Sequence, residues 1–144
     1  MSNLGRAIAI AASAHQDQLD KNGAPYILHP IRMMLNMGSE EQMIATVLHD
    51  VVEDTEWTLD QLRAEGFSDR IIHLVDLLSR KALESYAEFI ERVRTDPVAV
   101  KIKIADLEDN MDLTRLPKIT GKEISRLKRS HHYWLTLREN NQNG

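Results

Sequence analysis

The sequence predicts an all-α protein of about six to eight helices, and three observations support this prediction. Apolar residues recur at spacings of three and four along most of the 144 residues. Residues that cap or break helices stand between these periodic stretches. No segment shows the sustained alternation of apolar and polar residues that is typical of a half-buried strand. Because a chain of this length can bury one sizeable core, we expect a single domain over residues 1–144.

The first predicted helix covers residues 4–18. Ala is the best helix former and is frequent here. The side chains that recur at spacings of three and four are Leu4, Ile8, Ala11 and His15.

The next two predicted helices are defined by a proline and a cap. Pro30 suits the first turn of a helix that runs to about residue 38. Ser39, with Gln42 three residues later, has the pattern of a capping box. This box predicts the start of a central helix at residues 40–54.

Five further helices are predicted after residue 57. Four of them follow a Ser, Thr or Asp cap that has Gln, Glu or Pro at the expected spacing. These pairs are Thr58 with Gln61, Ser85 with Glu88, Asp96 with Pro97, and Thr120 with Glu123. The predicted helices lie at residues 58–66, 69–80, 85–93, 97–113 and 120–139.

Composition and charge exclude several classes of function. The chain is 42% hydrophobic and 28% charged, which is typical of a soluble globular protein. Its net charge of −4 and the absence of a long basic run argue against nucleic acid as a partner. No apolar stretch approaches the roughly 18 residues of a membrane span. We therefore expect a cytoplasmic protein that binds neither nucleic acid nor membrane, and the oligomeric state stays open.

The chain has no cysteine, and this limits the kind of metal site that it can form. Any metal ligand must be a histidine, a carboxylate, an amide oxygen or water. Such ligands favour a hard cation such as Mn²⁺ or Mg²⁺, or a transition metal held by histidine and carboxylate together.

Residues 48–55, with the sequence LHDVVEDT, contain the densest set of candidate ligands. His49 and Asp50 are followed one helical turn later by Glu53 and Asp54, so each would lie above a carboxylate in a helix. Charges beside valine and leucine side chains are costly unless something compensates them, and a divalent cation would do so. The alternative is a solvated acidic stripe on a surface helix.

Asp106 and His29 are further candidate metal ligands. Asp106 lies among apolar residues of the helix predicted at residues 97–113, and it shares a helix face with Asn110, which could donate to a substrate. His29 follows a turn and precedes Pro30, so its imidazole could be held in a fixed direction. The ordinary alternatives are a solvated acidic face for Asp106 and a packed histidine for His29.

Three basic residues are placed to contact phosphates near such a site. Lys21 lies in the turn before His29, and Arg115 belongs to a basic region near the C-terminus. Lys103 comes one turn or less before Asp106, although helix phase leaves open whether Lys101 or Lys103 faces the site. Each could also be a solvated surface charge.

Four separated motifs occur between about residues 14 and 111. They are Ala14-His15-x-x-Gln18, Lys21-x-Gly23-x-Pro25-Tyr26-Ile27-x-His29-Pro30, the LHDVVEDT stretch at 48–55, and Lys103-Ile104-Ala105-Asp106-x-x-x-Asn110-Met111. In this combination and order, the sequence resembles the HD-domain hydrolases of the RelA/SpoT group, especially the small stand-alone alarmone hydrolases. The resemblance implies an HD-domain helical bundle.

The resemblance also implies a reaction and a set of site residues. The family removes the 3′-pyrophosphate from (p)ppGpp, a small phosphorylated nucleotide, and holds one Mn²⁺ ion per chain. The implied metal ligands are His29, His49, Asp50 and Asp106. Glu53 and Asp54 would be the catalytic carboxylates that position and activate the attacking water. The expected substrate contacts are Lys21, Tyr26, Lys103, Asn110 and Arg115.

One departure from the family pattern leaves the substrate open. The family commonly has arginine, associated with the guanine base, where this sequence has Asp20. A carboxylate in place of a stacking cation weakens that base contact. Two alternatives therefore remain. One is an HD-type phosphohydrolase acting on another nucleotide or a phosphomonoester, and the other is a catalytically silent helical module that binds a nucleotide.

Overall fold

The computed structural model describes residues 3–143, with side chains described to residue 139. These residues form helices and no β-strand, apart from an isolated bridge between Leu19 and Pro25. The all-α prediction is confirmed. The helices are α1 (Leu4–Ala14), α2 (Leu28–Met34), α3 (Glu40–Leu48), α4 (Val51–Asp54), α5 (Leu59–Ala64), α6 (Asp69–Leu77), α7 (Tyr86–Val93), α8 (Pro97–Asn110), the 3-10 helix η1 (Leu113–Arg115) and α9 (Gly121–Asn143).

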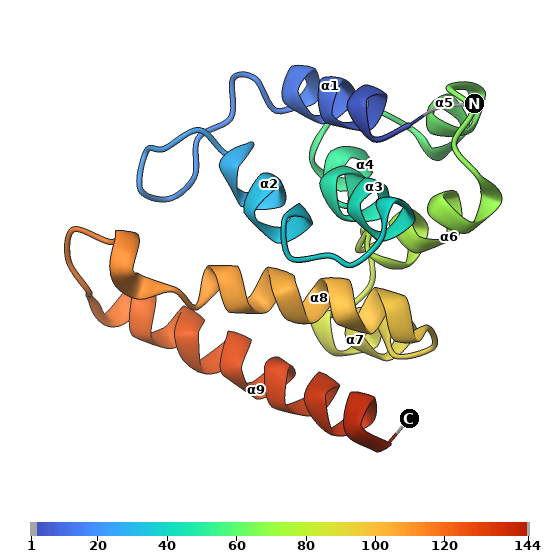
Figure 1. Cartoon of the computed structure of the whole chain (residues 1–144). Coiled ribbons are helices and arrows are strands. Elements are labelled where there is room, and N and C mark those ends of the chain that lie inside the picture. Colours follow the sequence, from blue (N-terminus) through green and yellow to red (C-terminus); the bar gives the residue numbers. More distant parts are fainter. Residues whose placement is uncertain (1–2, 144) are drawn as a thin grey trace.

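The helices enclose two groups of buried apolar side chains. One group lies among α1, α3, α5 and α6, and includes Val47 and Leu48, both fully buried. The other lies among α6, α7, α8 and α9, and includes Leu74 and Ile102. Figure 1 shows α8 and α9 running side by side in one layer, with α2 and α3 next to α8. The two groups of buried apolar side chains therefore meet at the side of α8 that faces α2 and α3.

Several predicted caps are confirmed. Thr58 and Gln61 exchange side-chain to backbone hydrogen bonds in both directions, as do Ser85 and Glu88. Asp96 accepts from the backbone at the start of α8, where Pro97 occupies the first turn. Caps of this kind satisfy the free N–H groups of a helix start, which is why their positions were predictable.

The capping box predicted at Ser39 and Gln42 is only half right. The Ser39 hydroxyl accepts from the backbone N–H of Gln42 at 3.2 Å. The second bond of a capping box, from the Ser39 backbone N–H to the Gln42 side chain, is not formed. The Gln42 side-chain oxygen accepts instead from Nζ of Lys101 at 3.0 Å. The glutamine thus connects α3 to α8 instead of closing the box.

The predicted central helix at residues 40–54 is wrong as one continuous element. It is interrupted at His49 and Asp50, between α3 and α4. Nδ1 of His49 lies 2.6 Å from the carbonyl oxygen of Thr46. In a regular helix this carbonyl would accept from the backbone of Asp50, so the imidazole competes with the helical hydrogen bond.

Other predicted bounds differ by a few residues. The first helix ends at Ala14 and not at residue 18, because the chain turns at His15. The second begins before Pro30 and ends at Met34. The helix predicted at residues 97–113 ends at Asn110, and the Asp112 side chain then starts η1 by accepting from the Thr114 backbone at 3.0 Å. None of the described helices combines the length and apolar character that a membrane crossing requires.

Candidate metal centre

The four predicted metal ligands lie together in one cluster. His29 is in the first turn of α2, His49 and Asp50 form the interruption between α3 and α4, and Asp106 lies one turn before the end of α8. His29, His49 and Asp106 are exposed by only 6%, 2% and 7%. Packing of α2 and α3 against α8 thus brings together side chains that are distant in sequence.

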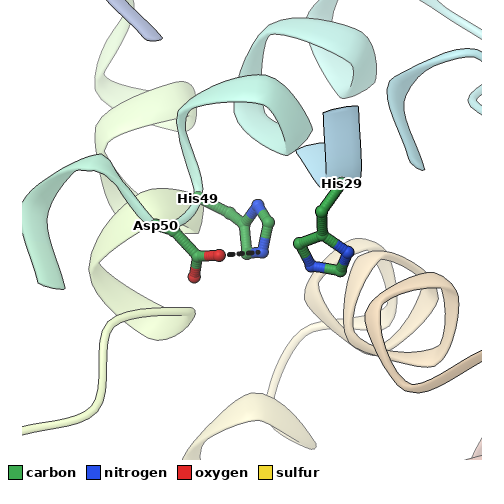
Figure 2. A group of neighbouring side chains, drawn as sticks. All are labelled: His29, His49 and Asp50. Carbon is green, nitrogen blue, oxygen red and sulfur yellow. Dashed lines mark ion pairs between the residues drawn. The ribbon is translucent and has the colours of Figure 1, made fainter. Parts of the chain in front are cut away.

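The distances within the cluster are short. Nε2 of His29 lies 2.7 Å from Oδ1 of Asp106, and Nε2 of His49 lies 3.7 Å from the same oxygen. Nε2 of His49 also lies 3.1 Å from Oδ2 of Asp50. Figure 2 shows the two imidazole rings side by side, with the Asp50 carboxylate next to His49. Ligand atoms of His29, His49 and Asp50 lie within 4.8 Å of one another, which is close enough to share one ion.

One nitrogen of His49 has no hydrogen-bond partner. Its Nδ1 must donate, because the Thr46 carbonyl at 2.6 Å can only accept. Its Nε2 is therefore the nitrogen left to bind a metal, and this buried atom makes no hydrogen bond, although Oδ2 of Asp50 lies 3.1 Å away. A buried polar atom without a partner is destabilising, and a metal ion would provide that partner. Two imidazoles and two carboxylates form a donor set that suits divalent transition metals.

The charges of the cluster strongly perturb its ionisable groups. Burial alone lowers the pKa of His29, but hydrogen bonds to Asp106 and Asp109 raise it to about 9. Burial works against ionisation of Asp106, yet the Lys103 charge and the two histidines hold its pKa well below the usual value. Because a metal binds the neutral form of imidazole, metal binding at this site must displace protons.

Tyr26 fixes the orientation of Asp50. The Tyr26 hydroxyl donates a hydrogen bond to Oδ2 of Asp50. Burial and the nearby Asp50 charge raise the pKa of Tyr26, so the phenol keeps its proton and remains a donor. This predicted substrate contact therefore lies at the site, directly beside a candidate ligand.

Lys103 has the corresponding role for Asp106. Nζ of Lys103 lies 2.6 Å from Oδ2 of Asp106, and over the rings of Phe89 and Tyr86 at 5.2 Å and 5.5 Å. Lys103 therefore faces the site, whereas Lys101 reaches Gln42. The question that helix phase left open is thus answered in favour of Lys103.

Glu53 and Asp54 lie at the exposed side of the cluster. Carboxylate oxygens of Asp50, Glu53 and Asp54 lie within 4.8 Å of one another. Glu53 accepts from the backbone N–H of Arg80 at 2.6 Å, which fixes its position. Partial burial of the Asp54 carboxyl group, together with the charges of Asp50 and Glu53, raises the pKa of Asp54 to about 6.

The other predicted substrate contacts are Lys21, Asn110 and Arg115. Lys21 is in the loop before α2, and its pKa is lowered by partial burial and by the charges of Arg126 and Arg129 on α9. Asn110 is exposed at the end of α8. Arg115 donates to the backbone oxygen of Asp109 at 2.9 Å and to Asp112 at 3.0 Å. Of these, Arg115 is already engaged with the end of α8.

The structure also explains what Asp20 does. Its Oδ1 accepts from the backbone N–H groups of Asn22 at 2.8 Å and Ala24 at 3.0 Å. Gly23 within this turn has a φ of 82°, a conformation that glycine adopts easily. Asp20 therefore closes the turn before His29, a role that its residue type predicts but that the sequence analysis did not assign.

Two residues of the site were missed by the sequence analysis. Asp109 lies behind His29, with Oδ2 at 2.6 Å from Nδ1, and Arg32 pairs with Asp109 at 2.8 Å and 2.9 Å. Each lies three residues after a predicted ligand, Asp106 or His29. A spacing of three places each of them on the same helix face as that ligand, but it does not show that the two residues pair with each other.

Comparison with known proteins gives the family. A family model described as an HD domain matches residues 7–97, which include His29, His49 and Asp50. The chain belongs to the HD-domain family. This family is known for a divalent metal site, which agrees with the cluster of histidines and aspartates.

The curated relatives are named for one of two activities. A probable GTP pyrophosphokinase of Mycobacterium leprae (strain TN) is 38% identical over 128 residues, which cover 80% of this HD-domain chain and 16% of that protein. A guanosine-3′,5′-bis(diphosphate) 3′-pyrophosphohydrolase of Aquifex aeolicus (strain VF5) is 31% identical over 118 residues, which cover 74% of this chain and 17% of that protein. The chain therefore spans about a sixth of the length of these curated relatives.

A solved structure matches nearly the whole HD-domain chain. It is described as a metazoan ortholog of SpoT that hydrolyzes ppGpp and plays a role in starvation responses. The TM-score is 0.78 at 25% sequence identity, and the match covers 98% of this chain and 86% of that one. The predicted HD-domain helical bundle is thereby confirmed.

Proposed function

We propose that this chain is a Mn²⁺-dependent pyrophosphohydrolase that removes the 3′-pyrophosphate from (p)ppGpp. The observation that carries the proposal is the buried cluster of His29, His49, Asp50 and Asp106, in which Nε2 of His49 has no hydrogen-bond partner. The substrate is supported by the name of the Aquifex aeolicus relative and by the description of the metazoan structure.

The four residues of the cluster would hold the metal. A bound divalent ion supplies a Lewis acid for a phosphoryl oxygen and lowers the pKa of a water molecule. The chain's contribution is to orient the ligands, because Tyr26 and Lys103 each hold one oxygen of a ligating aspartate. Outer hydrogen bonds of this kind stabilise metal sites and tune their affinity.

Asp54 is the group best suited to accept a proton from the attacking water. Its pKa of about 6 lies near neutral pH, so it can act as a general base there. Glu53, held by the Arg80 backbone, would orient the same water. Both roles follow from the position of these carboxylates beside Asp50 at the exposed side of the cluster.

Substrate phosphates would be bound by basic side chains of the loop before α2 and of α9. The charges of Arg126 and Arg129 help to lower the pKa of Lys21, and positive charges that interact in this way favour a polyanion. Asn110 would donate to the nucleotide directly. Lys103 and Arg115 would act indirectly, since they are paired with Asp106 and Asp109.

A different substrate is the second candidate, and Asp20 favours it. The turn that Asp20 closes lies where the family's base-associated arginine is expected, so the chain lacks that cation there. A different nucleotide or a phosphomonoester would use the same metal and the same carboxylates. Only the base contact would change.

Product analysis tests the proposal. Purified protein is incubated with ppGpp and Mn²⁺, with and without a chelator, beside a panel of other nucleotides and phosphomonoesters. Hydrolysis of ppGpp with one water should release pyrophosphate and leave GDP, and the chelator should stop it. Turnover of another nucleotide but not of ppGpp would show that the substrate is a different one. Binding of a nucleotide without any product would favour the catalytically silent binding module.

Substitutions then test the assigned roles. Asp50→Ala and Asp106→Ala should each abolish both activity and metal binding. Circular dichroism should still show a folded helical protein, although Asp106→Ala leaves Lys103 without its partner and lowers stability. Activity retained in both variants would contradict the mechanism.

A further inference from the structure

His29 is held from behind by a pair of charged residues. Its Nδ1 lies 2.6 Å from Oδ2 of Asp109. Arg32 donates to both oxygens of Asp109, from Nε at 2.8 Å and from Nη2 at 2.9 Å. His29 and Arg32 are three residues apart on α2, and Asp106 and Asp109 are three residues apart on α8. The two helices therefore meet through two successive side-chain contacts.

The two histidines of the metal cluster have different acceptors behind them. Nδ1 of His49 lies 2.6 Å from a neutral carbonyl, that of Thr46. Nδ1 of His29 lies at the same distance from a carboxylate, that of Asp109. Each acceptor keeps a hydrogen on Nδ1, so Nε2 is the nitrogen that faces the ligating aspartates and would bind a metal after losing its own proton. A carboxylate additionally makes the imidazole a stronger ligand.

Asp109 is itself firmly held. Its side chain is 12% exposed, so its negative charge needs compensation. The bidentate pair with Arg32 provides this charge and fixes the plane of the carboxylate. Arg115 adds a second guanidinium at 3.5 Å. Asp109 can therefore act as a fixed acceptor for His29 without leaving its place to bind the metal.

We propose that Asp109 is a positioning residue that orients His29 for metal binding, and that Arg32 anchors Asp109. This inference rests on the proposed metal site and adds to it a residue that ligates nothing. The competing explanation is purely structural. In that case Asp109 and Arg32 merely tie α2 to α8, and either one could be removed with the same effect on the site.

Mn²⁺ affinity, measured by electron paramagnetic resonance without substrate, separates the two explanations. The variants are Asp109→Leu, which removes the acceptor, Asp109→Asn, which keeps an acceptor oxygen, and Arg32→Met, which removes the tie but leaves the acceptor. Asp112→Asn is the matched control, since Asp112 is a nearby aspartate that pairs with Arg115 and does not contact His29.

We expect Asp109→Leu to lower Mn²⁺ affinity by about tenfold or more, as loss of an outer hydrogen bond to a metal-binding histidine typically does. Asp109→Asn should recover part of this loss. Arg32→Met should lower affinity less than Asp109→Leu does, and Asp112→Asn should leave it unchanged. Circular dichroism identifies any variant that fails to fold, and Asp109→Asn then carries the test in place of Asp109→Leu.

Three results would overturn the inference. Equal losses in Asp109→Leu and Arg32→Met would show that the tie between the helices is what matters. Wild-type affinity in both Asp109 variants would show that His29 needs no acceptor. Failure of the wild-type protein to bind Mn²⁺ would overturn the proposed function as well, so the two failures are distinguishable.

Discussion

Nζ of Lys103 lies 2.6 Å from Oδ2 of Asp106, and Oδ1 of the same carboxylate lies 2.7 Å from Nε2 of His29. A buried lysine thus compensates a buried aspartate at the centre of the site. When one partner of such a pair is removed, the charge that remains is left without compensation. This is strongly destabilising, whereas the intact pair adds little.

Replacement of Lys103 by methionine should therefore destabilise the metal-free protein. We expect the free energy of unfolding to fall by about 3 kcal/mol, measured by urea denaturation in the presence of a chelator. Saturating Mn²⁺ should recover part of the loss, because the cation compensates Asp106. Lys101→Met is the control and should cost less than about 0.5 kcal/mol, since Lys101 is exposed. Equal losses in the two variants would contradict this account of Asp106.

Asp20 should contribute to stability through its turn. Asp20→Ala removes the acceptor for the Asn22 and Ala24 N–H groups and should lower the free energy of unfolding by about 1 kcal/mol. Asp20→Asn keeps an acceptor oxygen and should lose less. Thermal unfolding of the two variants side by side measures the difference, and an Asn variant as unstable as the Ala variant would be the contrary result.

The same residue bears on substrate choice. Asp20→Arg introduces the cation that the family commonly has at this position. If guanine is the base that this chain binds, the substitution should increase turnover of ppGpp relative to other nucleotides. No relative gain would favour the second candidate, in which the substrate carries another base. Since Asp20→Arg also loses the turn acceptor, Asp20→Ala is the reference for the comparison.

The Glu84–Arg92 pair should make stability depend on acid pH. Arg92 donates to both oxygens of Glu84 at 2.5 Å and 2.9 Å, and this pairing lowers the pKa of Glu84 to about 2. Because the folded pKa is below the ordinary value of 4.5, the contribution is complete above pH 4.5. It is lost as the pH falls toward 2.

Glu84→Gln should therefore flatten the fall in the free energy of unfolding across that range. Urea denaturation at several pH values measures the slope, with Glu91→Gln, a more exposed carboxylate of α7, as the control. Wild-type and Glu84→Gln curves that fall in parallel would show that Glu84 does not contribute to the acid sensitivity.

The sequence predicted the helical fold well because its signals are local. Reciprocal caps such as Thr58 with Gln61 depend on residues three apart, and they were found where expected. The interruption at His49 could not be predicted in this way. It depends on which way one imidazole points, and that is decided by packing against α2 and α8.

The candidate site shows the same difference between local signals and contacts that depend on packing. Ligand types and their order could be read from the motifs, and the structure brings His29, His49, Asp50 and Asp106 together. The outer contacts could not be read. The pairing of Asp109 with Arg32 joins residues 77 positions apart on two helices, and no local pattern in the sequence indicates it.

The central claim is that these four side chains bind one divalent cation, and anomalous X-ray diffraction from Mn²⁺-soaked crystals at the manganese absorption edge tests it most directly. The account predicts one strong peak per chain, in contact with Nε2 of His29, Nε2 of His49, and carboxylate oxygens of Asp50 and Asp106. It also predicts that the peak disappears in Asp106→Ala crystals. A peak held only by Asp50, Glu53 and Asp54, or no peak at saturating Mn²⁺, would contradict it.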